Sequence, residues 1–413
     1  MIIDAAYATT HLPRRFAGNP LIEALGGLID PQVRLKALVR LPKIDLAESK
    51  CNAYFVRSFD IDCLSGLYLP PQVALALLTA IDHALHEGYF VRNPFSAETQ
   101  RRLYEAGDLI AAQGGDFDTL PTMIFLTGLS GLGKTRLVRM ILYSYAQTIR
   151  HRSYQGRDFS ETQVVWLSVE VPATGSVKTL ILQLFAALDR ALGQHRSPES
   201  YAAEHADSSV ETLISAFAHA AGSHHLGILH IDDLQRVLDS GAGVKAIVRF
   251  VIQLASIVKF PVIYSCTEDM EGVLKELKNF ESARRAIKDG AFVLHKPASA
   301  DDPFFKLLFS EVMRYQWTDV PIAPSDKLRR TLYILCAGVT AVFLFLHRAA
   351  QRHALSTGAK QLLLAHYYYV YRHRLRTIRK SLHAIRRDAE TDMAALDRFL
   401  QSLPQDDDLR SPP

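Results

Sequence analysis

The residues with the clearest chemistry lie in one short segment, Gly128-Leu-Ser-Gly-Leu-Gly-Lys-Thr135. An apolar run precedes it and a helical pattern follows, which is the context of a phosphate-binding loop. Glycines let backbone N–H groups converge on phosphate oxygens, and the N-terminus of the next helix adds its dipole. Lys134 is expected to neutralise terminal phosphate charge and Thr135 to ligate Mg²⁺. The segment predicts a site for ATP or a related nucleotide.

The alternative interpretation of this segment is a glycine-rich turn that only joins a strand to a helix. Such a turn does not require Lys and Thr in this order, so we favour the nucleotide site. The residues expected to contact the nucleotide are Gly128, Leu129, Ser130, Gly131, Leu132, Gly133, Lys134, Thr135 and Arg136.

A second acidic element is expected to complete the metal site. The run Leu226-Gly-Ile-Leu-His-Ile231 reads as a strand and delivers Asp232 and Asp233 to the carboxyl edge of a sheet. Asp232 is predicted to hold Mg²⁺, directly or through water. Asp233 is placed to polarise an attacking water, although a Glu there would reach further, so slow hydrolysis is expected. Its alternative role is that of a helix N-cap.

Two further positions are candidates for the γ-phosphate. Thr267 follows the next apolar run and is predicted to bond the γ-phosphate or the attacking water, with an ordinary strand-end hydroxyl as the alternative. Arg284 and Arg285 precede the last apolar run, where an arginine could reach a neighbouring subunit's nucleotide. Surface arginines are usually only solvated, which is the competing interpretation.

The elements that position these residues are predicted from short apolar runs separated by helix-length segments. The runs are Met123–Thr127, Val164–Val171, Ile228–Ile231, Val262–Cys266 and Ala291–Leu294. This alternation predicts a parallel sheet flanked by helices, an α/β fold of the P-loop NTPase type. The part before it reads as mixed helix and loop, with a helix at Val73–His86, and the part after Pro297 reads as helical through Leu400.

Length and composition agree with a globular chain. The 413 residues are 48% hydrophobic, and Lys plus Arg exceeds Asp plus Glu by four, which permits a nucleic-acid partner without establishing one. Four scattered cysteines favour a reducing compartment without disulfides or zinc. No secretory signal is visible, and the uncharged run Thr331–Leu346 is short for a membrane span. We expect a cytoplasmic protein with no membrane partner.

Several segments resemble TnsC, the AAA+ regulator ATPase of bacterial DNA transposons, and the related TniB-type ATPases. Asn19–Leu25 and Gly88–Pro94 are similar to the family's motifs that precede the ATPase core. Gly175–Lys178 and Leu188–Gly193 resemble its helix after the second core strand, and Ser282–Arg285 resembles its arginine segment. The resemblance covers most of the chain. It implies an AAA+ core at 119–297, an N-terminal extension at 1–118, a helical lid at 298–400 and a disordered tail at 401–413.

The resemblance also implies function. The family assembles with ATP into rings or filaments around duplex DNA, links a target selector of the TniQ or TnsD type to transposase, and is reset by hydrolysis in the bacterial cytoplasm. By resemblance Arg284 or Arg285 acts in trans, and Lys178, assisted by Thr174 and Ser176, contacts the DNA backbone without reading bases. From the residues alone, Lys178 is more simply a solvated lysine at a helix start.

Departures from the family pattern leave alternatives open. Asp233 stands where the family usually has Glu, and Gly338-Val-Thr340 opens a lid helix without a nearby arginine to act as a second sensor. A basic stretch, Arg372–Lys380 with Arg386 and Arg387, follows three tyrosines and reads equally as a DNA contact or as a solvated face. The alternatives to a transposition regulator are a helicase-loader or initiator-like AAA+ ATPase and a signalling NTPase that binds no DNA.

Overall fold

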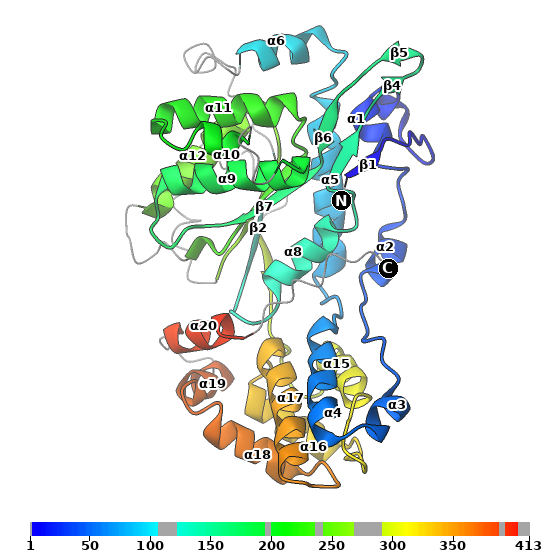
Figure 1. Cartoon of the computed structure of the whole chain (residues 1–413), viewed down its shortest axis with the longest axis vertical. Coiled ribbons are helices and arrows are strands. Elements are labelled where there is room, and N and C mark those ends of the chain that lie inside the picture. Colours follow the sequence, from blue (N-terminus) through cyan, green and yellow to red (C-terminus); the bar gives the residue numbers. More distant parts are fainter. Residues whose placement is uncertain are drawn as a thin grey trace. The chain divides into compact units, whose positions relative to one another are not determined.

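A computed structural model of the chain describes residues 2–105, 122–194, 200–235, 243–267, 291–387 and 393–403. Contacts divide the chain into two compact units, whose elements are labelled in Figure 1. Unit 1 holds the residues up to 34 together with 73–127 and 135–293. Unit 2 holds residues 35–72 and 128–134 together with those from 294 onward. The segment 128–134 is the phosphate loop predicted from the sequence.

A five-stranded sheet forms the centre of unit 1, in the order β10-β2-β9-β8-β7. The pairs β2–β9, β9–β8 and β8–β7 are parallel. Taken along the chain as strands one to five, this order is 5-1-4-3-2. The strands are β2 (Met123–Gly128), β7 (Trp166–Glu170), β8 (Ile228–Asp232), β9 (Val262–Ser265) and β10 (Ala291–Leu294). The predicted parallel sheet is confirmed, with the first and third strands each one residue longer than expected.

The strands form because both faces of the sheet are covered. Alternate residues of a strand point to opposite faces, and Phe125, Leu229, Ile231 and Tyr264 belong to one core cluster. The same cluster includes residues of three helices, α9 (Val177–Leu192), α11 (Val210–Ser223) and α12 (Gly243–Val258). The intervening strand residues are buried as well, and α5 (Ala74–Phe90) contacts β8. Near-continuous apolar runs are what a sheet covered on both faces requires.

Two small sheets in unit 1 were not predicted. In the first, β1 (Ile2–Asp4) pairs in parallel with β3 (Thr148–Arg150), which pairs antiparallel with β6 (Thr162–Val164). In the second, β4 (Ser153–Tyr154) pairs with β5 (Arg157–Asp158). The first residues of the chain are therefore not only helix and loop. Strands of two or three residues are too short to show the alternation on which strand prediction rests.

The two N-terminal segments that resemble the TnsC family pack against each other. Asn19 caps α1 (Pro20–Glu23), and its Nδ2 donates to the Tyr89 carbonyl at 2.8 Å. Arg92 is buried, and its guanidinium donates to the carbonyls of Leu226 at 2.5 Å and Gly227 at 3.3 Å. Those carbonyls lie just before β8, so this part of the extension satisfies polar groups of the ATPase sheet. The remaining helices with residues in unit 1 are η1 (Arg14–Phe16), α2 (Pro31–Ala37), α6 (Ala97–Glu105), α8 (Lys134–Leu142) and α10 (Tyr201–Glu204).

Unit 2 is helical and combines residues 35–72 with those from 294 onward. The Trp317 side chain is fully buried, and its indole N–H donates to Ser49 Oγ at 3.0 Å. Its backbone N–H donates to Gln351 Oε1 at 2.8 Å. Residues 35–72 therefore contribute to the core of this unit. Its helices are α3 (Leu46–Cys51), α4 (Tyr54–Asp60), η2 (Ile61–Gly66), α15 (Pro303–Met313), α16 (Asp326–Cys336), α17 (Thr340–Ser356), α18 (Leu364–His373), α19 (Arg379–Arg386) and α20 (Ala394–Gln401).

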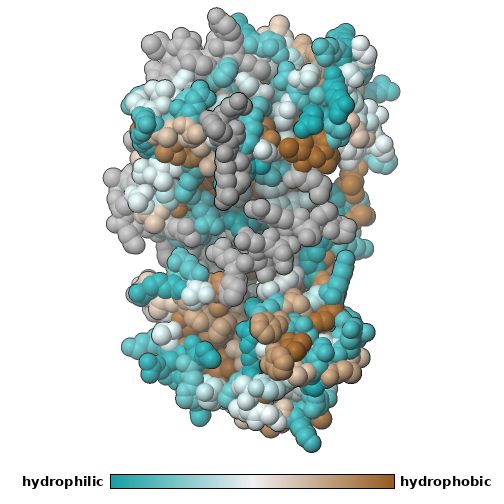
Figure 2. All heavy atoms as spheres, viewed as in Figure 1, coloured by the Kyte–Doolittle hydropathy of each residue, from teal (hydrophilic) through white to brown (hydrophobic). Residues whose placement is uncertain are grey.

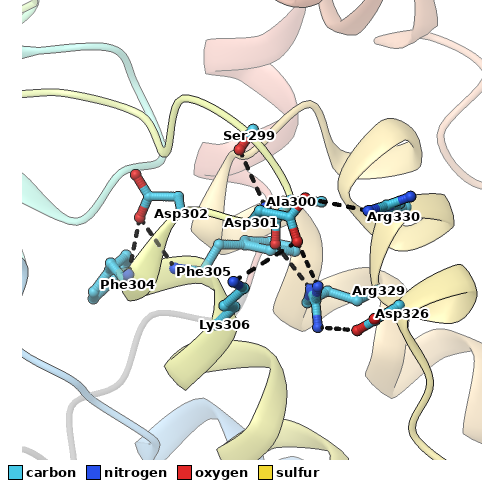
Figure 3. Close-up of polar contacts among 10 residues, drawn as sticks. All are labelled: Ser299, Ala300, Asp301, Asp302, Phe304, Phe305, Lys306, Asp326, Arg329 and Arg330. Carbon is cyan, nitrogen blue, oxygen red and sulfur yellow. Dashed lines mark hydrogen bonds and ion pairs between the residues drawn. The ribbon is translucent and has the colours of Figure 1, made fainter.

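Charged groups fix the start of α15 to α16, as Figure 3 shows. Asp302 caps α15 by accepting from the backbone N–H groups of its first turn. The neighbouring Asp301 accepts from Arg329 at 2.6 Å and from Arg330 at 3.5 Å. Arg329 also pairs with Asp326 at 2.6 Å. In this corner the arginines of α16 are therefore matched by carboxylates.

The uncharged run Thr331–Leu346 is divided between two helices. A left-handed turn at Ala337 and Gly338, with φ of 54° and 77°, separates α16 from α17. In the part of the chain that the structure describes, no single helix is long and apolar enough to cross a membrane. The pair α16 and α17 reaches the required length and composition together, with a bend of 114° between the two helices.

Candidate nucleotide-binding site

The predicted phosphate loop connects β2 to α8. Gly128, Gly131 and Gly133 have φ values of 148°, 80° and 99°, a range that residues with a side chain rarely adopt. A Cβ atom at Gly128 would also overlap the Leu294 carbonyl oxygen at the end of β10. The helix α8 begins at Lys134, and the first N–H groups of a helix have no acceptor within it. The glycines of the motif are therefore required by the path of the backbone.

Lys134 is buried despite its charge, with 8% of its surface exposed. Its Nζ donates to the Gly128 carbonyl at 2.7 Å and to the Leu129 carbonyl at 3.2 Å. These bonds offset part of the cost of burying an ammonium group. They also hold the side chain against its own loop, where phosphate oxygens are predicted to lie. Of the other predicted contacts, Leu132 is buried, and Ser130 and Arg136 are half-buried.

Within unit 2, the phosphate loop contacts two helices. The backbone N–H of Ala341, in the first turn of α17, donates to the Gly131 carbonyl at 3.0 Å. A Cβ atom placed on Gly131 would lie 2.9 Å from Leu400 Cδ1 of α20 and 2.9 Å from Val339 Cγ1. The loop thus has little free space on this side, and its position depends on α17 and α20.

In unit 1, the structure brings Thr135 to Asp232. Asp232 is the last residue of β8 and is 1% exposed, and the Thr135 hydroxyl donates to its carboxylate. Burial raises the pKa of Asp232 above its ordinary value, while the Thr135 bond and the nearby Arg139 lower it. Its Oδ1 accepts from the Asp233 N–H at 3.0 Å. Its Oδ2 is buried with no hydrogen-bond partner among the described residues.

The neighbouring strand β7 and the helix α8 each supply a charged group that the sequence analysis missed. Glu170, the last residue of β7, stands opposite Asp232 in the parallel register. Its Oε1 accepts from Arg139 of α8 at 3.2 Å, and both side chains are partly exposed. Glu170 raises and Arg139 lowers the pKa of Asp232, although burial has the larger effect. The available signal was a carboxylate near the end of an otherwise apolar run.

A buried histidine connects three strands beneath this edge. His230 Nδ1 lies 2.9 Å from Ser168 Oγ of β7, and its Nε2 lies 2.9 Å from Ser265 Oγ of β9. Burial lowers the pKa of His230 to about 3, so the ring is neutral and one ring nitrogen accepts while the other donates. These two bonds hold the ends of β7, β8 and β9 together, which keeps Asp232 in place.

Asp233 and Thr267 lie at the same edge of the sheet. Asp233 has a left-handed backbone with φ of 56°, and its Oδ1 accepts from Gln235 Nε2 at 3.0 Å. Thr267 follows β9, the strand between β2 and β8, and is 6% exposed. The Thr267 hydroxyl is buried with no hydrogen-bond partner among the described residues. Both side chains therefore end at the carboxyl edge of the strands, as predicted.

The other predicted residues lie elsewhere in the chain. Thr174 and Ser176 belong to the loop between β7 and α9, where Ser176 caps α9 by accepting from the Thr179 N–H. Lys178 is the second residue of α9 and is half-buried. Arg284 and Arg285 lie outside the residues that the structure describes.

The side chains around Asp232 fit a magnesium-bound nucleotide. Hydroxyl and carboxylate oxygens, the groups that Thr135 and Asp232 present, are the ligands that Mg²⁺ prefers. A buried acceptor without a partner costs about 1–3 kcal/mol, and Asp232 Oδ2 is such an atom. A metal ion or one of its waters would satisfy that oxygen. The Thr267 hydroxyl is equally able to bond a phosphate oxygen.

Part of the chain matches a known protein family, and several solved structures are similar to it. The AAA domain family matches residues 118–274. Solved structures of similar fold include the Orc1 protein of Aeropyrum pernix in complex with DNA, at 17% identity, with a TM-score of 0.41 over 68% of this chain and 66% of that chain. The Orc2 protein of the same organism, in ADPNP–ADP complexes, is 12% identical, with a TM-score of 0.43 over 74% and 70% of the two chains.

A Walker-type ATPase of Pyrococcus abyssi is 15% identical and has a TM-score of 0.40 over 71% of this chain and 75% of its own. These likenesses are similarities of fold. No curated protein matches the chain. The glycine loop between β2 and α8 and the strand order of 5-1-4-3-2 give the chain the P-loop AAA+ fold. Its residues 118–274 match the AAA domain family.

Proposed function

We propose that this chain is an AAA+ ATPase that assembles on duplex DNA when ATP is bound and is reset when the ATP is hydrolysed. The observation that carries the proposal is the half-buried Thr135 hydroxyl beside the buried Asp232 carboxylate at the edge of the sheet. Thr135 ends a phosphate-loop sequence whose glycines have the required backbone, and Asp232 Oδ2 has no hydrogen-bond partner among the described residues. A structural strand end has no need for a buried, partnerless carboxylate oxygen.

The residue roles in the proposed site follow from their chemistry. The backbone N–H groups from Gly128 to Thr135 and the start of α8 bind phosphate oxygens, and the Lys134 ammonium neutralises them. The Thr135 hydroxyl and the Asp232 carboxylate hold Mg²⁺, which would neutralise phosphate charge when bound. The Thr267 hydroxyl bonds the γ-phosphate or the attacking water.

Hydrolysis is proposed to be slow. Asp233 is assigned the task of polarising the attacking water, and its carboxylate is one methylene shorter than that of Glu. Its Oδ1 also accepts from Gln235 at 3.0 Å, which restricts its orientation further. Arg284 or Arg285 is proposed to contact the nucleotide of an adjacent subunit in a homo-oligomeric ring or filament. A slow ATPase of this kind acts as an assembly switch.

The proposed DNA contact in unit 1 is the start of α9. Lys178 is half-buried at the second position of this helix, after the Ser176 cap and the Thr174 side chain. In an oligomer, this set would repeat in every subunit and follow phosphates without reading bases.

Two cellular processes are candidates for the one in which this ATPase acts. An initiator-like or helicase-loader-like AAA+ ATPase needs only the AAA domain and a replication partner, and we place it first for that reason. A transposition regulator, which brings a TniQ or TnsD type selector to transposase, is the second candidate. Its support is the packing of two TnsC-like segments, in which Asn19 bonds Tyr89 and Arg92 bonds the carbonyls before β8. None of the proteins named above is described as acting in transposition.

The experiment is a titration of purified protein with duplex DNA, with ATP, with a slowly hydrolysed analogue and without nucleotide, followed by electron microscopy. Rings or filaments that require nucleotide and disappear in Lys134→Ala are expected. Lys306→Ala, which removes a half-exposed lysine, is the matched control and is expected to assemble normally. Nucleotide binding without any DNA-bound assembly would instead indicate a signalling NTPase.

The metal assignment is tested by Asp232→Asn. This change removes a buried charge that has no full set of partners, so the unfolding temperature without nucleotide is expected to stay the same or rise. Magnesium-dependent ATP hydrolysis is expected to fall by about two orders of magnitude. A variant with unchanged hydrolysis would remove Asp232 from the metal site. Co-purification with transposase or with a replicative helicase separates the two finer candidates.

A further inference from the structure

Unit 2 contains a long segment without acidic side chains. From 327 to 387 there is no Asp or Glu, whereas Lys or Arg occurs at 327, 329, 330, 348, 352, 360, 372, 374, 376, 379, 380, 386 and 387. The last seven of these fall on α18, the turn after it, α19 and the residue that follows α19. A concentration of one charge sign on consecutive elements is the electrostatic footprint of a polyanion site.

The two halves of this segment differ in how their charges are compensated. In the first half, Arg329 and Arg330 pair with Asp301, as Figure 3 shows, and Arg348 and Arg352 both pair with Asp62. In the second half, no carboxylate among the described residues pairs with a basic side chain. Among the described residues, Arg386 bonds the His383 ring and the Ile334 carbonyl. The exposed basic side chains of α18 and α19 therefore have no carboxylate partner in the part of the chain that the structure describes.

The basic side chains are held outward by the apolar side of the same helices. We call Arg372, Arg374, Arg376, Lys380 and Arg387 the basic face, and all five are exposed. The apolar side chains between them are buried, with exposed fractions of 0–6%; they are Val370, Leu375, Ile378, Leu382 and Ile385. The helices cannot rotate without exposing these core residues, so the charges are presented at fixed positions.

The positive potential of this surface lowers the pKa of two neighbouring histidines. His383 is fully exposed, yet its pKa is lowered, first by Arg386 and further by Arg387 and Arg379. His353 of α17 has a pKa lowered by burial and then by Arg374 and His373. Positive charge from several arginines thus disfavours protonation of both rings.

A surface hollow lies beside the basic face. It has a volume of about 410 Å³ and is lined by Ala365, Tyr368, Tyr369, Arg372 and His373. The Tyr369 ring is stacked on His353, with centroids 3.7 Å apart, and lies 4.4 Å from the His373 ring. His353 covers one face of the Tyr369 ring, which is 42% exposed, so less of this ring is open for stacking on an unpaired base. The hollow combines hydroxyl and guanidinium donors, which suit a sugar–phosphate backbone better than a base.

We propose that the basic face of α18 and α19 binds the phosphate backbone of duplex DNA, separately from the Lys178 loop and without a requirement for nucleotide. The choice of duplex DNA rests on the proposed function. A membrane surface fits less well, because Leu382 and Ile385, the apolar residues of α19, are buried in the protein. Figure 2 shows hydrophilic colours predominating over α18 and α19, whose positions are labelled in Figure 1.

The test compares two triple variants of equal charge. Arg372→Ala/Arg376→Ala/Lys380→Ala removes three charges of the basic face. Lys306→Ala/Lys327→Ala/Arg330→Ala removes three exposed charges elsewhere in the same unit. Affinity for a 30-base-pair duplex is measured by fluorescence anisotropy between about 50 and 200 mM salt, without nucleotide. Because the substituted side chains are exposed, both variants are expected to keep the wild-type circular dichroism spectrum and unfolding temperature.

The basic-face variant is expected to bind at least tenfold more weakly. The slope of log K against log salt is expected to decrease by about 2–3, because each lost phosphate contact changes it by about 0.9. The control variant is expected to lose less than about threefold. Equal losses in both variants, or no duplex binding by the wild type without nucleotide, would overturn the inference. Binding to phosphatidylserine vesicles but not to DNA would overturn it as well.

Different experimental results would contradict the proposed function and this inference. Lys134→Ala is expected to abolish nucleotide-dependent assembly but to keep nucleotide-free binding at the basic face. If Lys134→Ala assembles normally while the basic-face variant still loses affinity, the proposed function is wrong and the inference stands. If the basic-face variant binds like the wild type while Lys134→Ala fails to assemble, the inference is wrong and the proposed function stands.

Discussion

At the scale of single residues, several ionisable side chains of this protein are buried and need partners that replace water. Asp232 and Lys134 are 1% and 8% exposed, and His230 is fully buried between two serines. Taking charged groups out of water costs several kcal/mol unless partners replace the solvent. The bonds of Lys134 to its own loop, and the bond of Thr135 to Asp232, supply part of that replacement. The remainder is what a bound nucleotide and its metal ion are proposed to supply.

His347 makes the stability of unit 2 dependent on pH. The ring is fully buried; its Nδ1 lies 2.7 Å from the Tyr367 hydroxyl, and its Nε2 lies 3.1 Å from the Tyr315 carbonyl. Burial lowers its pKa from 6.5 to about 4. Because the folded pKa is the lower one, the unfolded chain takes up the proton first. Stability is therefore complete above pH 6.5 and is lost as the pH falls toward 4, by about 3 kcal/mol in total.

The prediction is that the unfolding free energy of His347→Gln changes less with pH than that of the wild type. Between pH 7 and 4.5, the wild type is expected to lose about 2 kcal/mol more than this variant. Urea unfolding followed by Trp317 fluorescence in a Trp166→Phe background measures unit 2 alone. His295→Gln, a change at an exposed histidine, is expected to follow the wild type. Parallel pH curves for wild type and His347→Gln would contradict the prediction.

Among the elements, the phosphate loop contains two glycines that distinguish the cost of a left-handed backbone from the cost of steric overlap. Gly131 and Gly133 both have positive φ, at 80° and 99°. A Cβ atom at Gly133 meets nothing within 4 Å, whereas a Cβ at Gly131 would press on Leu400 and Val339. Left-handed backbone costs an ordinary residue about 1–2 kcal/mol, and overpacking a filled space costs about 1–3 kcal/mol more.

Gly133→Ala is therefore expected to lower the unfolding free energy of unit 2 by the backbone cost alone, and Gly131→Ala by the sum of both costs. In a Leu400→Ala background, the cost of Gly131→Ala is expected to fall by about 1 kcal/mol, because half of the steric overlap is removed. Urea unfolding without nucleotide measures all four variants. If the Leu400→Ala background leaves the cost of Gly131→Ala unchanged, then α20 does not support the loop.

The elements also show how far the sequence predicts the structure. Apolar runs bounded by turn residues predicted all five strands of the main sheet, because a sheet buried on both faces needs such runs. The apolar runs missed β1, β3 and β6, whose pairing depends on partners up to 146 positions away and not on local pattern. They also missed Glu170, because its place opposite Asp232 is set by the register of β7 and β8.

The sequence predicted the parts of the candidate site that belong to a local motif. It missed the contacts that form only when separate strands pair. The phosphate loop, Asp232 and Thr267 follow directly from strand ends. The hydrogen bonds from Ser168 to His230 and from His230 to Ser265 depend on the order of three strands in the sheet, which cannot be read from any single segment. The roles of all the predicted site residues stay predictions, including those of the phosphate loop, Asp232 and Thr267, and so does the transposition function inferred from resemblance to TnsC.

At the scale of the whole molecule, the N-terminal segments are part of the ATPase unit. Arg92 is buried and bonds two backbone carbonyls that precede β8. Arg92→Met would leave both carbonyls without these donors, at about 1–3 kcal/mol each. The unfolding free energy of unit 1 is therefore expected to fall by roughly 2–6 kcal/mol. Urea unfolding with Trp166 as the probe, in a Trp317→Phe background, measures this loss.

Arg15→Met is the matched control for Arg92→Met. Arg15 pairs with Glu87 at the surface and is 54% exposed, so the loss is expected to stay below about 1 kcal/mol. If both variants lose the same free energy, the buried bonds of Arg92 do not stabilise unit 1 and the N-terminal segments are only attached to it.

The bonds of Arg92 also determine when unit 1 can complete its folding during synthesis of the chain. Its two acceptors lie 134 and 135 positions further along. A ribosome that adds about 5–20 residues each second needs roughly ten seconds to make that stretch. During this interval the guanidinium stays in water and the N-terminal segment has no strand end to close. The core of unit 1 can therefore close only after the ribosome has passed β8, which leaves the nascent chain dependent on protection from aggregation until then.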